Sequence, residues 1–295
     1  MSPPELSVAV ASVNGFPYVG ECLESLRRNA PTTQVVVADW TDDETRRRIH
    51  EGWPEATLVS FDEPAAVPEL RAAAIAAATA PCVAVIEDHC VVPEGWADAI
   101  LAGHRAGHHV VGGGVRNVKT ERARDWAAFL CEYSAMMDPI SAGEVDVLTG
   151  MNVSYDREAL AAIADLLRAG RWENELHARL RERGFALWSE PGAVIEHAKD
   201  FGFREFASQR YHYSRSYAGR RSELVGSRRW LYALAAPLLI PLVVARVSRN
   251  VRARPGYGRT FRRALPLVLA YSTVWAFGEL VGYIFGGGRS ILAVR

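Results

Sequence analysis

Short apolar runs alternate with longer amphipathic segments over the first 115 residues. The runs are rich in β-branched residues, as in strands buried on both faces of a sheet; they lie at 6–12, 34–39, 56–61 and 82–87. The segments between them have apolar residues at helical spacing, a capping residue or a run of alanines; they lie at 19–28, 41–49 and 67–79. The alternation predicts an α/β fold, a mostly parallel sheet with helices on both faces.

Polar side chains follow three of these runs at the point where each predicted strand ends. They are Asn14, Asp39 and the triplet Glu87-Asp88-His89. In a parallel sheet, ligands bind beyond the carboxyl ends of the strands, so the chemistry is expected here. Taken alone, Asn14 and Asp39 fit a turn and a helix cap equally well. The triplet suits either a divalent cation such as Mg²⁺ or Mn²⁺, or a charged hydrogen-bonding cluster.

The order of several motifs resembles the nucleotide-binding half of family 2 glycosyltransferases, which have the GT-A fold. The motifs are VASVNG, VVVADWTDDET, PELRAAAIAAATAP, VAVIEDHCVVPEGW, GMNVSYDREAL, RWENELHARLRERGF and VIEHA. The resemblance covers roughly residues 6–198. It implies a GT-A domain that uses a nucleotide-sugar donor and a divalent cation, Mn²⁺ or Mg²⁺.

The resemblance also implies roles for individual positions. Asp39 corresponds to the acidic residue that holds uracil or ribose, and the triplet to the Asp-x-Asp element that binds the cation and the diphosphate. The implied donor-binding residues are Asn14, Asp39, Arg71, Glu87, Asp88, Gly150, Asn152, Gln209, Arg210 and Arg215. The implied metal ligands are Asp88, His89 and His197.

Three positions depart from the family's usual residues. Glu87 and His89 stand where the family has the first and last Asp of its motif, and Ala38 replaces the first of two acidic residues. Imidazole is a better ligand for Mn²⁺ than for Mg²⁺. Alternatively, Asp88 alone holds the metal while His89 contacts phosphate.

One carboxylate is needed to take the proton of the acceptor in an inverting glycosyl transfer. The segment 171–180 places Glu173 at the start of a predicted helix, and the resemblance favours it as this base, with Glu175 in reserve. A solvated helix start that favours acidic residues is the structural alternative.

The C-terminal third of the chain is basic and apolar. Residues 201–295 hold 16 Arg, no Lys and 3 Glu, and apolar runs lie at 231–245 and 264–285. The first run is interrupted by Pro237 and Pro241 and is too short to span a bilayer, so it is expected to dip in and return. The combination favours an anionic membrane surface over nucleic acid. In the alternative, both runs are core helices of a soluble protein.

The predicted organisation is a catalytic domain over 1–200, an aromatic and basic connecting segment over 201–229, and a membrane-associated helical hairpin over 230–295. No signal sequence or cysteine framework is evident, so the catalytic part is expected on the cytoplasmic face of the membrane. The sequence predicts an inverting glycosyltransferase that moves sugar from a UDP-sugar to a lipid-linked or cell-surface glycan acceptor. A non-catalytic sugar-nucleotide-binding scaffold is the main alternative. A nucleotidyltransferase is disfavoured because VNGFPYVGE is not a Gly-rich, basic phosphate loop.

Overall fold

The computed structural model describes residues 3–294, which form two compact units. The first unit comprises residues up to 118 and 136–199, and the second comprises 119–135 and the chain from 200 onward. The predicted boundaries at residues 200 and 229 stay a prediction. Segment 119–135, which the sequence pattern did not distinguish from the catalytic part, belongs to the second unit.

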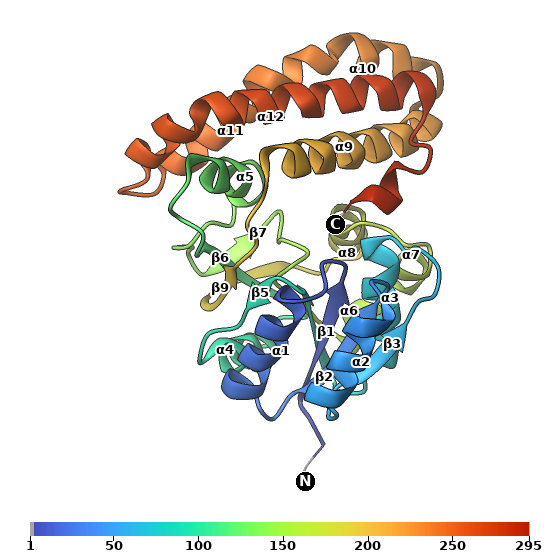
Figure 1. The fold of residues 1–295 in the computed structure, drawn as a ribbon, viewed down its shortest axis with the longest axis vertical. Helices are drawn as coiled ribbons and strands as arrows, with labels where there is room; N and C mark the ends of the chain where they lie inside the picture. Colours follow the sequence, from blue (N-terminus) through green and yellow to red (C-terminus); the bar gives the residue numbers. More distant parts are fainter. Residues whose placement is uncertain (1–2, 295) are drawn as a thin grey trace. The chain divides into compact units, whose positions relative to one another are not determined.

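The first unit is built on one mixed sheet (Figure 1). Along its main path the strands follow the order β3 (Thr57–Ser60), β2 (Gln34–Asp39), β1 (Leu6–Ser12), β4 (Cys82–Glu87), β8 (Val153–Asp156), β6 (Val110–Asn117), β9 (Leu187–His197) and β5 (Cys90–Val91), and β7 (Gly143–Val145) pairs with β9. The first four strands are parallel to one another, and β8 is antiparallel to both of its neighbours.

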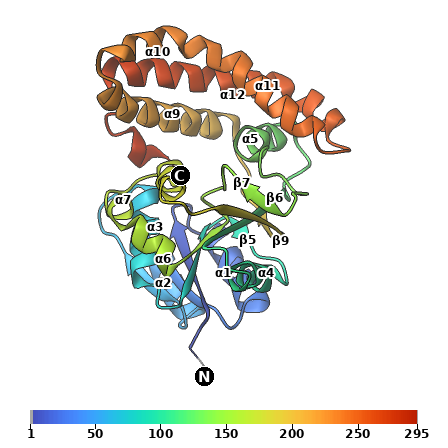
Figure 2. The same cartoon turned by 180° about the vertical axis from the view of Figure 1, so that it is seen from behind.

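The apolar composition of the central strands follows from their place in the sheet. All seven residues of β1 are buried, as expected for a strand covered on both faces. The helices of this unit are α1 (Tyr18–Asn29), α2 (Asp43–Gly52), α3 (Val67–Ala77), α4 (Trp96–Arg105), α6 (Arg157–Ala162), α7 (Ala164–Arg168) and α8 (Glu173–Glu182). Helices cover both faces of the sheet: α1 and α2 lie in front of it in Figure 1, and α6 lies in front of it in the opposite view of Figure 2.

Local signals in the sequence explain where these helices begin. The Asp42 side chain accepts a hydrogen bond from the backbone N–H of Thr45 at 2.7 Å and caps α2. At α3, Pro68 occupies the first turn, and Glu69 accepts from the backbone N–H of Ala66. The predicted strands and helices of residues 6–87 are confirmed to within two residues at most boundaries.

The second unit is helical. It contains α5 (Ala123–Tyr133), α9 (Phe203–Val225), α10 (Arg229–Ala235), α11 (Leu239–Arg252) and α12 (Gly258–Phe285), with short 3₁₀ turns at Gly226–Arg228, Ala236–Leu238 and Ser290–Ala293. Helix α12 packs on α9, α5 and α11. The predicted connecting segment is thus mostly the 23-residue helix α9.

Pro237 and Pro241 do not end the helical path through residues 231–245, although the sequence predicted that they would interrupt it. Pro237 lies in the 3₁₀ turn between α10 and α11, and Pro241 lies in the first turn of α11. Proline is tolerated at such positions because the first-turn N–H groups lack intrahelical partners. The helical path therefore continues from Arg229 to Arg252.

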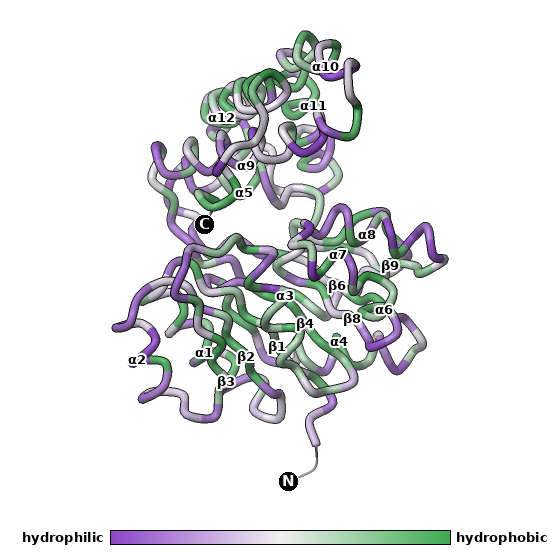
Figure 3. Tube along the Cα trace, turned by 90° about the vertical axis from the view of Figure 1, so that its right-hand side faces the viewer, coloured by the Kyte–Doolittle hydropathy of each residue, from purple (hydrophilic) through white to green (hydrophobic). Residues whose placement is uncertain are grey.

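Two stretches in this unit are long and apolar enough to cross a membrane, Phe203–Arg252 and Gly258–Phe285. Of the most apolar 18 residues in each stretch, only 22% and 39% are buried within the structure. Figure 3 colours much of α10 and α12 as hydrophobic. The two segments are therefore not mainly buried within the described structure.

Candidate active site

Three parallel strands end side by side and carry the first of the predicted site residues. Ser12 of β1 pairs in register with Asp39 of β2, and Ala11 pairs with Glu87 of β4. The Asp39 carboxylate is fully buried and accepts hydrogen bonds from the hydroxyls of Ser12 at 2.7 Å and Thr41 at 2.9 Å. Burial raises the pKa of Asp39 above its usual value, although these hydrogen bonds act in the opposite direction.

Asp88 binds the loop that follows β1. One carboxylate oxygen accepts from the backbone N–H groups of Val13 and Asn14, at 2.8 and 2.6 Å. The other accepts from the Asn14 side-chain amide at 2.6 Å and lies 3.3 Å from His89 Nδ1. Burial raises the pKa of Asp88, but the contacts with His89 and Asn14 outweigh it and leave that pKa below its usual value. Groups of the chain itself therefore occupy both oxygens of this carboxylate.

His89 is oriented by that contact with Asp88. Nδ1 also lies 3.5 Å from the side-chain amide of Asn14; where Nδ1 donates to the Asp88 carboxylate, which only accepts hydrogen bonds, Nε2 is left with its lone pair. This buried Nε2 makes no hydrogen bond with the described residues and lies 3.4 Å from Glu87 Oε2. A lone pair facing a carboxylate oxygen is repulsive, and a proton or a cation between the two atoms relieves it. An acidic residue that orients a histidine toward a cation is a common arrangement in metal sites.

His197 lies beside His89. It ends β9, and its ring packs edge-to-face on His89 with centroids 4.9 Å apart. Burial, together with His89 and Lys199, holds the pKa of His197 well below its usual value, so the ring is neutral.

Arg71 joins two carboxylates that are far apart in the sequence. One guanidinium nitrogen donates to Glu87 Oε1, and the other donates to Glu173 Oε2 at 2.9 Å. Burial lowers the pKa of Arg71, but the two carboxylates raise it more strongly, so the guanidinium stays charged. This bridge brings the start of α8 to the end of β4.

Gly150 makes room for that bridge. A Cβ atom at this position would lie 2.5 Å from Arg71 Nη1 and 2.8 Å from Glu173 Oε2. Any side chain larger than hydrogen would therefore displace the ion pair. Gly150, expected from its motif to let backbone approach a ligand, here lets backbone approach Arg71 and Glu173.

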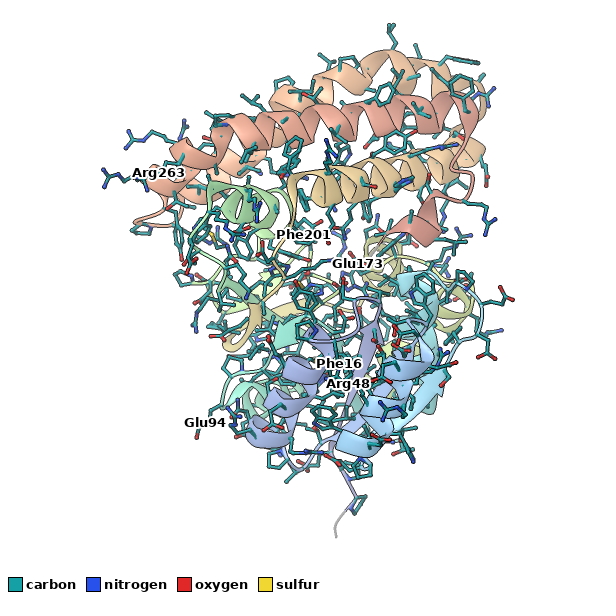
Figure 4. The ribbon with its side chains drawn as sticks, viewed as in Figure 1. Phe16, Arg48, Glu94, Glu173, Phe201 and Arg263 are labelled. Carbon is teal, nitrogen blue, oxygen red and sulfur yellow. The ribbon has the colours of Figure 1, made fainter. Side chains whose placement is uncertain are left out.

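The two candidate bases have different surroundings. Glu173 lies in the first turn of α8 (Figure 4), and its side chain is 24% exposed. Glu175 lies 3.8 Å from Arg171, which precedes α8, whereas Glu173 is the residue that Arg71 binds. The structure places Glu173, and not Glu175, with the other strand-end residues.

Lys199 is a site residue that the sequence reasoning missed. Its ammonium group is buried and donates to Asn14 Oδ1 at 2.7 Å. The signal was its position two residues after His197, since alternate residues of an extended chain point to the same side. Lys199 places a positive charge beside Asn14, the residue that also binds Asp88.

The remaining predicted donor-binding residues have other partners. Asn152 is fully buried, accepts from Trp96 Nε1 at 3.0 Å and donates to the carbonyls of Gly114 and Ala193.

Gln209, Arg210 and Arg215 lie on α9, in the second unit. There, Arg210 pairs with Glu132 among aromatic rings, and Arg215 Nε donates to the Gly286 carbonyl at 3.2 Å. Their donor contacts stay a prediction.

The predicted metal ligands do not form a complete set by themselves. Among residues 3–294, no group of three or more His, Cys, Asp or Glu side chains has the arrangement of a metal site. Glu87 Oε2 and His89 Nε2 remain as two facing donors, an oxygen and a nitrogen, which suit Mn²⁺. These two atoms would hold a cation, with Asp88 orienting His89.

Comparisons with known proteins agree with this geometry. The model of the family described as Glycosyl transferase family 2 matches residues 7–163, just over half of the chain. Among curated proteins, none matches the chain.

Solved structures of low sequence identity share the fold. A mannosyltransferase, PcManGT from Pyrobaculum calidifontis, in complex with GDP-Man and Mn²⁺, matches with a TM-score of 0.57 and 17% identity, covering 94% of this chain and 87% of its own. S. aureus TarS 1-349 matches with a TM-score of 0.52 and 14% identity, and its complex with UDP with 0.51 and 15%. Both TarS matches cover 93% of this chain and 92% of TarS. The predicted GT-A fold is confirmed.

Proposed function

The chain belongs to glycosyltransferase family 2, and from this we propose that it transfers a sugar with inversion from a nucleotide-diphosphate donor to a lipid-linked or cell-surface glycan. The observation that carries the proposal is the Arg71 bridge between Glu87 and Glu173 at the strand ends. It joins the predicted base to the predicted diphosphate site across a gap of about one hundred residues in the sequence.

Glu173 is proposed as the general base. Its Oε2 is held by Arg71, while Oε1 makes no hydrogen bond with any other described residue. An acceptor hydroxyl would attack the anomeric carbon from the face opposite the nucleoside diphosphate. As the bond to the leaving phosphate oxygen breaks, the hydroxyl proton passes to Glu173.

The donor is proposed to be a UDP-sugar held by the strand-end residues. Asp39 is placed by Ser12 and Thr41 at the edge where the base and ribose of a nucleotide would bind. Support also comes from the fold neighbours, since one is in complex with UDP and the other with GDP-Man.

A divalent cation is proposed to be held by Glu87 Oε2 and His89 Nε2. When bound, it neutralises charge that builds up on the departing diphosphate. Asp88 keeps His89 in the required tautomer, and Lys199 adds a positive charge beside Asn14. The Mn²⁺ in the complex of the mannosyltransferase neighbour supports this choice.

The acceptor is proposed to be presented at a membrane, on its cytoplasmic face. Of the large hydrophobic side chains that are exposed in the described structure, ten of twelve lie in the second unit. Exposed apolar surface of this extent usually marks a binding interface.

A thermal-shift screen of UDP- and GDP-sugars, each with and without Mn²⁺, tests the donor and cation together. One donor should stabilise the protein, by about 2.7 kcal/mol at a concentration one hundred times its Kd. Glu87→Gln should reduce the part of this stabilisation that depends on Mn²⁺. The control Glu190→Gln, in the central part of β9, should leave it unchanged. If no nucleotide sugar raises the unfolding temperature, the donor proposal is wrong.

A further inference from the structure

A pocket of about 540 Å³ lies at the turn between α11 and α12, wholly within the second unit. Four of its ten lining residues are arginines, and none is acidic. We call it the arginine pocket; it is lined by Ser248, Val251, Arg252, Arg254, Pro255, Gly256, Gly258, Arg259, Phe261 and Arg262. It is distinct from the strand-end residues, which all belong to the first unit.

Three of the four arginines in the pocket have no acidic partner among the described residues. Arg252, Arg259 and Arg262 are exposed and form no ion pair with the described residues. Arg254 is held in place by hydrogen bonds to the carbonyls of Asn250 at 3.0 Å and Ala135 at 2.8 Å. Guanidinium groups bind phosphate oxygens in a bidentate manner, so a pocket with several of them favours a phosphate-bearing anion.

An apolar surface leads toward this pocket along α10 and α11. Leucines 62% to 81% exposed recur at helical spacing and form what we call the leucine stripe, Leu231, Leu234, Leu238 and Leu242. The same helical face continues to Arg249 and Arg252, seven and ten residues after the last leucine. A helix that exposes leucines next to arginines is typical of one that lies in a membrane interface.

The packing of α12 on α9 argues against a membrane-spanning orientation for α12. Phe203 of α9 stacks on Tyr271, and Tyr211 stacks on Phe277, with ring centroids 5.4 and 5.9 Å apart. Farther along, a Cβ atom on Gly282 of α12 would lie 2.5 Å from the Arg215 carbonyl of α9. The two helices are therefore packed side by side from Tyr271 to the end of α12.

Helix α9 carries charges throughout this contact. They are Arg204, Glu205, Arg210, Arg215, Arg220, Arg221 and Glu223. If α12 crossed a bilayer, α9 would enter the hydrocarbon core with it. Transfer of each of these charged side chains from water into hydrocarbon would cost free energy. Glu279, the one acidic residue of α12, is buried within the unit and accepts from Trp275 Nε1 at 2.8 Å.

We propose that the second unit lies in the plane of an anionic bilayer surface, with the leucine stripe inserted and a lipid phosphate bound in the arginine pocket. The proposal deepens the membrane part of the proposed function and does not depend on the identity of the donor. Figure 4 shows Arg263, next to the pocket residue Arg262, extending away from the helices. A nucleic acid would also satisfy the arginines, but it would leave the adjacent leucines in water.

Co-sedimentation with vesicles tests the pocket. The full-length protein should bind vesicles of phosphatidylcholine containing phosphatidylglycerol far better than phosphatidylcholine alone. The triple variant Arg252→Gln, Arg259→Gln, Arg262→Gln should bind the anionic vesicles about 150-fold more weakly, because each basic residue near the surface contributes a factor of about five. The control variant Arg28→Gln, Arg168→Gln, Arg183→Gln removes the same charge from exposed positions of the first unit and should bind like the parent.

Equal weakening of vesicle binding in both triple variants would overturn the proposed phosphate site, because net charge alone would then account for the binding. Tighter binding to a single-stranded oligonucleotide than to anionic vesicles, lost in the pocket variant, would assign the site to nucleic acid instead. In either case release of nucleoside diphosphate from a donor would be unaffected, so failure of this inference is separable from failure of the glycosyltransferase proposal.

Thiol labelling tests the in-plane orientation. All four native cysteines are buried, so Ala253→Cys and Arg289→Cys place new exposed thiols at the two ends of α12. In sealed inverted membrane vesicles, an impermeant maleimide should label both variants, because both ends lie on the cytoplasmic side. Labelling of only one of them would show that α12 crosses the bilayer and would overturn the orientation.

Discussion

Substitution of Gly150 by alanine perturbs the Arg71 bridge without removing any charge. The added Cβ would lie 2.5 Å from Arg71 Nη1 and 2.8 Å from the Glu173 carboxylate, so the ion pair must shift by ~1 Å to restore ordinary contact. A misplacement of ~1 Å in a reacting group costs ~10²-fold in rate. Overpacking of this kind also costs about 1–3 kcal/mol in unfolding free energy.

The assay is release of nucleoside diphosphate from the donor found in the thermal-shift screen, with kcat and KM measured separately. We expect kcat to fall ~10²-fold and KM to change little, because the base is displaced more than the nucleotide site. Gly52→Ala is the matched control, since a Cβ there would contact nothing within 4 Å. In a Glu173→Gln background, Gly150→Ala should cause no further loss of kcat. Parent-level kcat in Gly150→Ala would refute the role of the bridge.

Three further predictions concern the surroundings of the site. His89→Asp should shift the metal preference of turnover from Mn²⁺ toward Mg²⁺, and an unchanged preference would show that His89 is not a ligand. Asp88→Asn should lower unfolding free energy by about 3–5 kcal/mol in urea titration, because an amide cannot accept all the hydrogen bonds made to this buried carboxylate, and a loss below 1 kcal/mol would contradict its role. Burial, with Arg181 and Arg71 nearby, lowers the pKa of His177 to about 3, so the unfolded chain binds a proton near pH 6.5 that the folded chain does not. Stability should fall by about 1.4 kcal/mol from this residue between pH 7.5 and 5.5, and His177→Gln should remove that part of the pH slope.

The parallel half of the sheet could be predicted from the sequence because its strands are buried on both faces. Such burial leaves a continuous apolar run, as in LSVAVAS, and each run is followed by the polar residues that meet at the strand ends. The local pattern therefore specified Asp39 and the Glu87 triplet correctly as neighbours, and the structure brings Glu173 to them.

Long-range contacts account for what sequence reasoning missed. The Arg71 bridge joins residues 102 positions apart, and Lys199 meets Asn14 across 185 positions, so no local pattern reports either pair. Likewise, the hydrogen bonds that Asp88 accepts from the loop after β1 span 75 and 74 positions, while its role as a metal ligand stays a prediction from its motif. That α5 belongs with the C-terminal helices follows from its packing on α12, which its own composition does not show.

The most direct test of the central claim is the release of nucleoside diphosphate by purified Glu173→Gln and Glu175→Gln variants, compared with the parent protein, using its best nucleotide-sugar donor and acceptor. Glutamine preserves the shape of the side chain but cannot accept a proton. We predict that Glu173→Gln loses ~10²-fold or more in kcat with nearly unchanged donor affinity, whereas Glu175→Gln retains parent activity. Parent-level turnover by Glu173→Gln would contradict the assignment of the catalytic site.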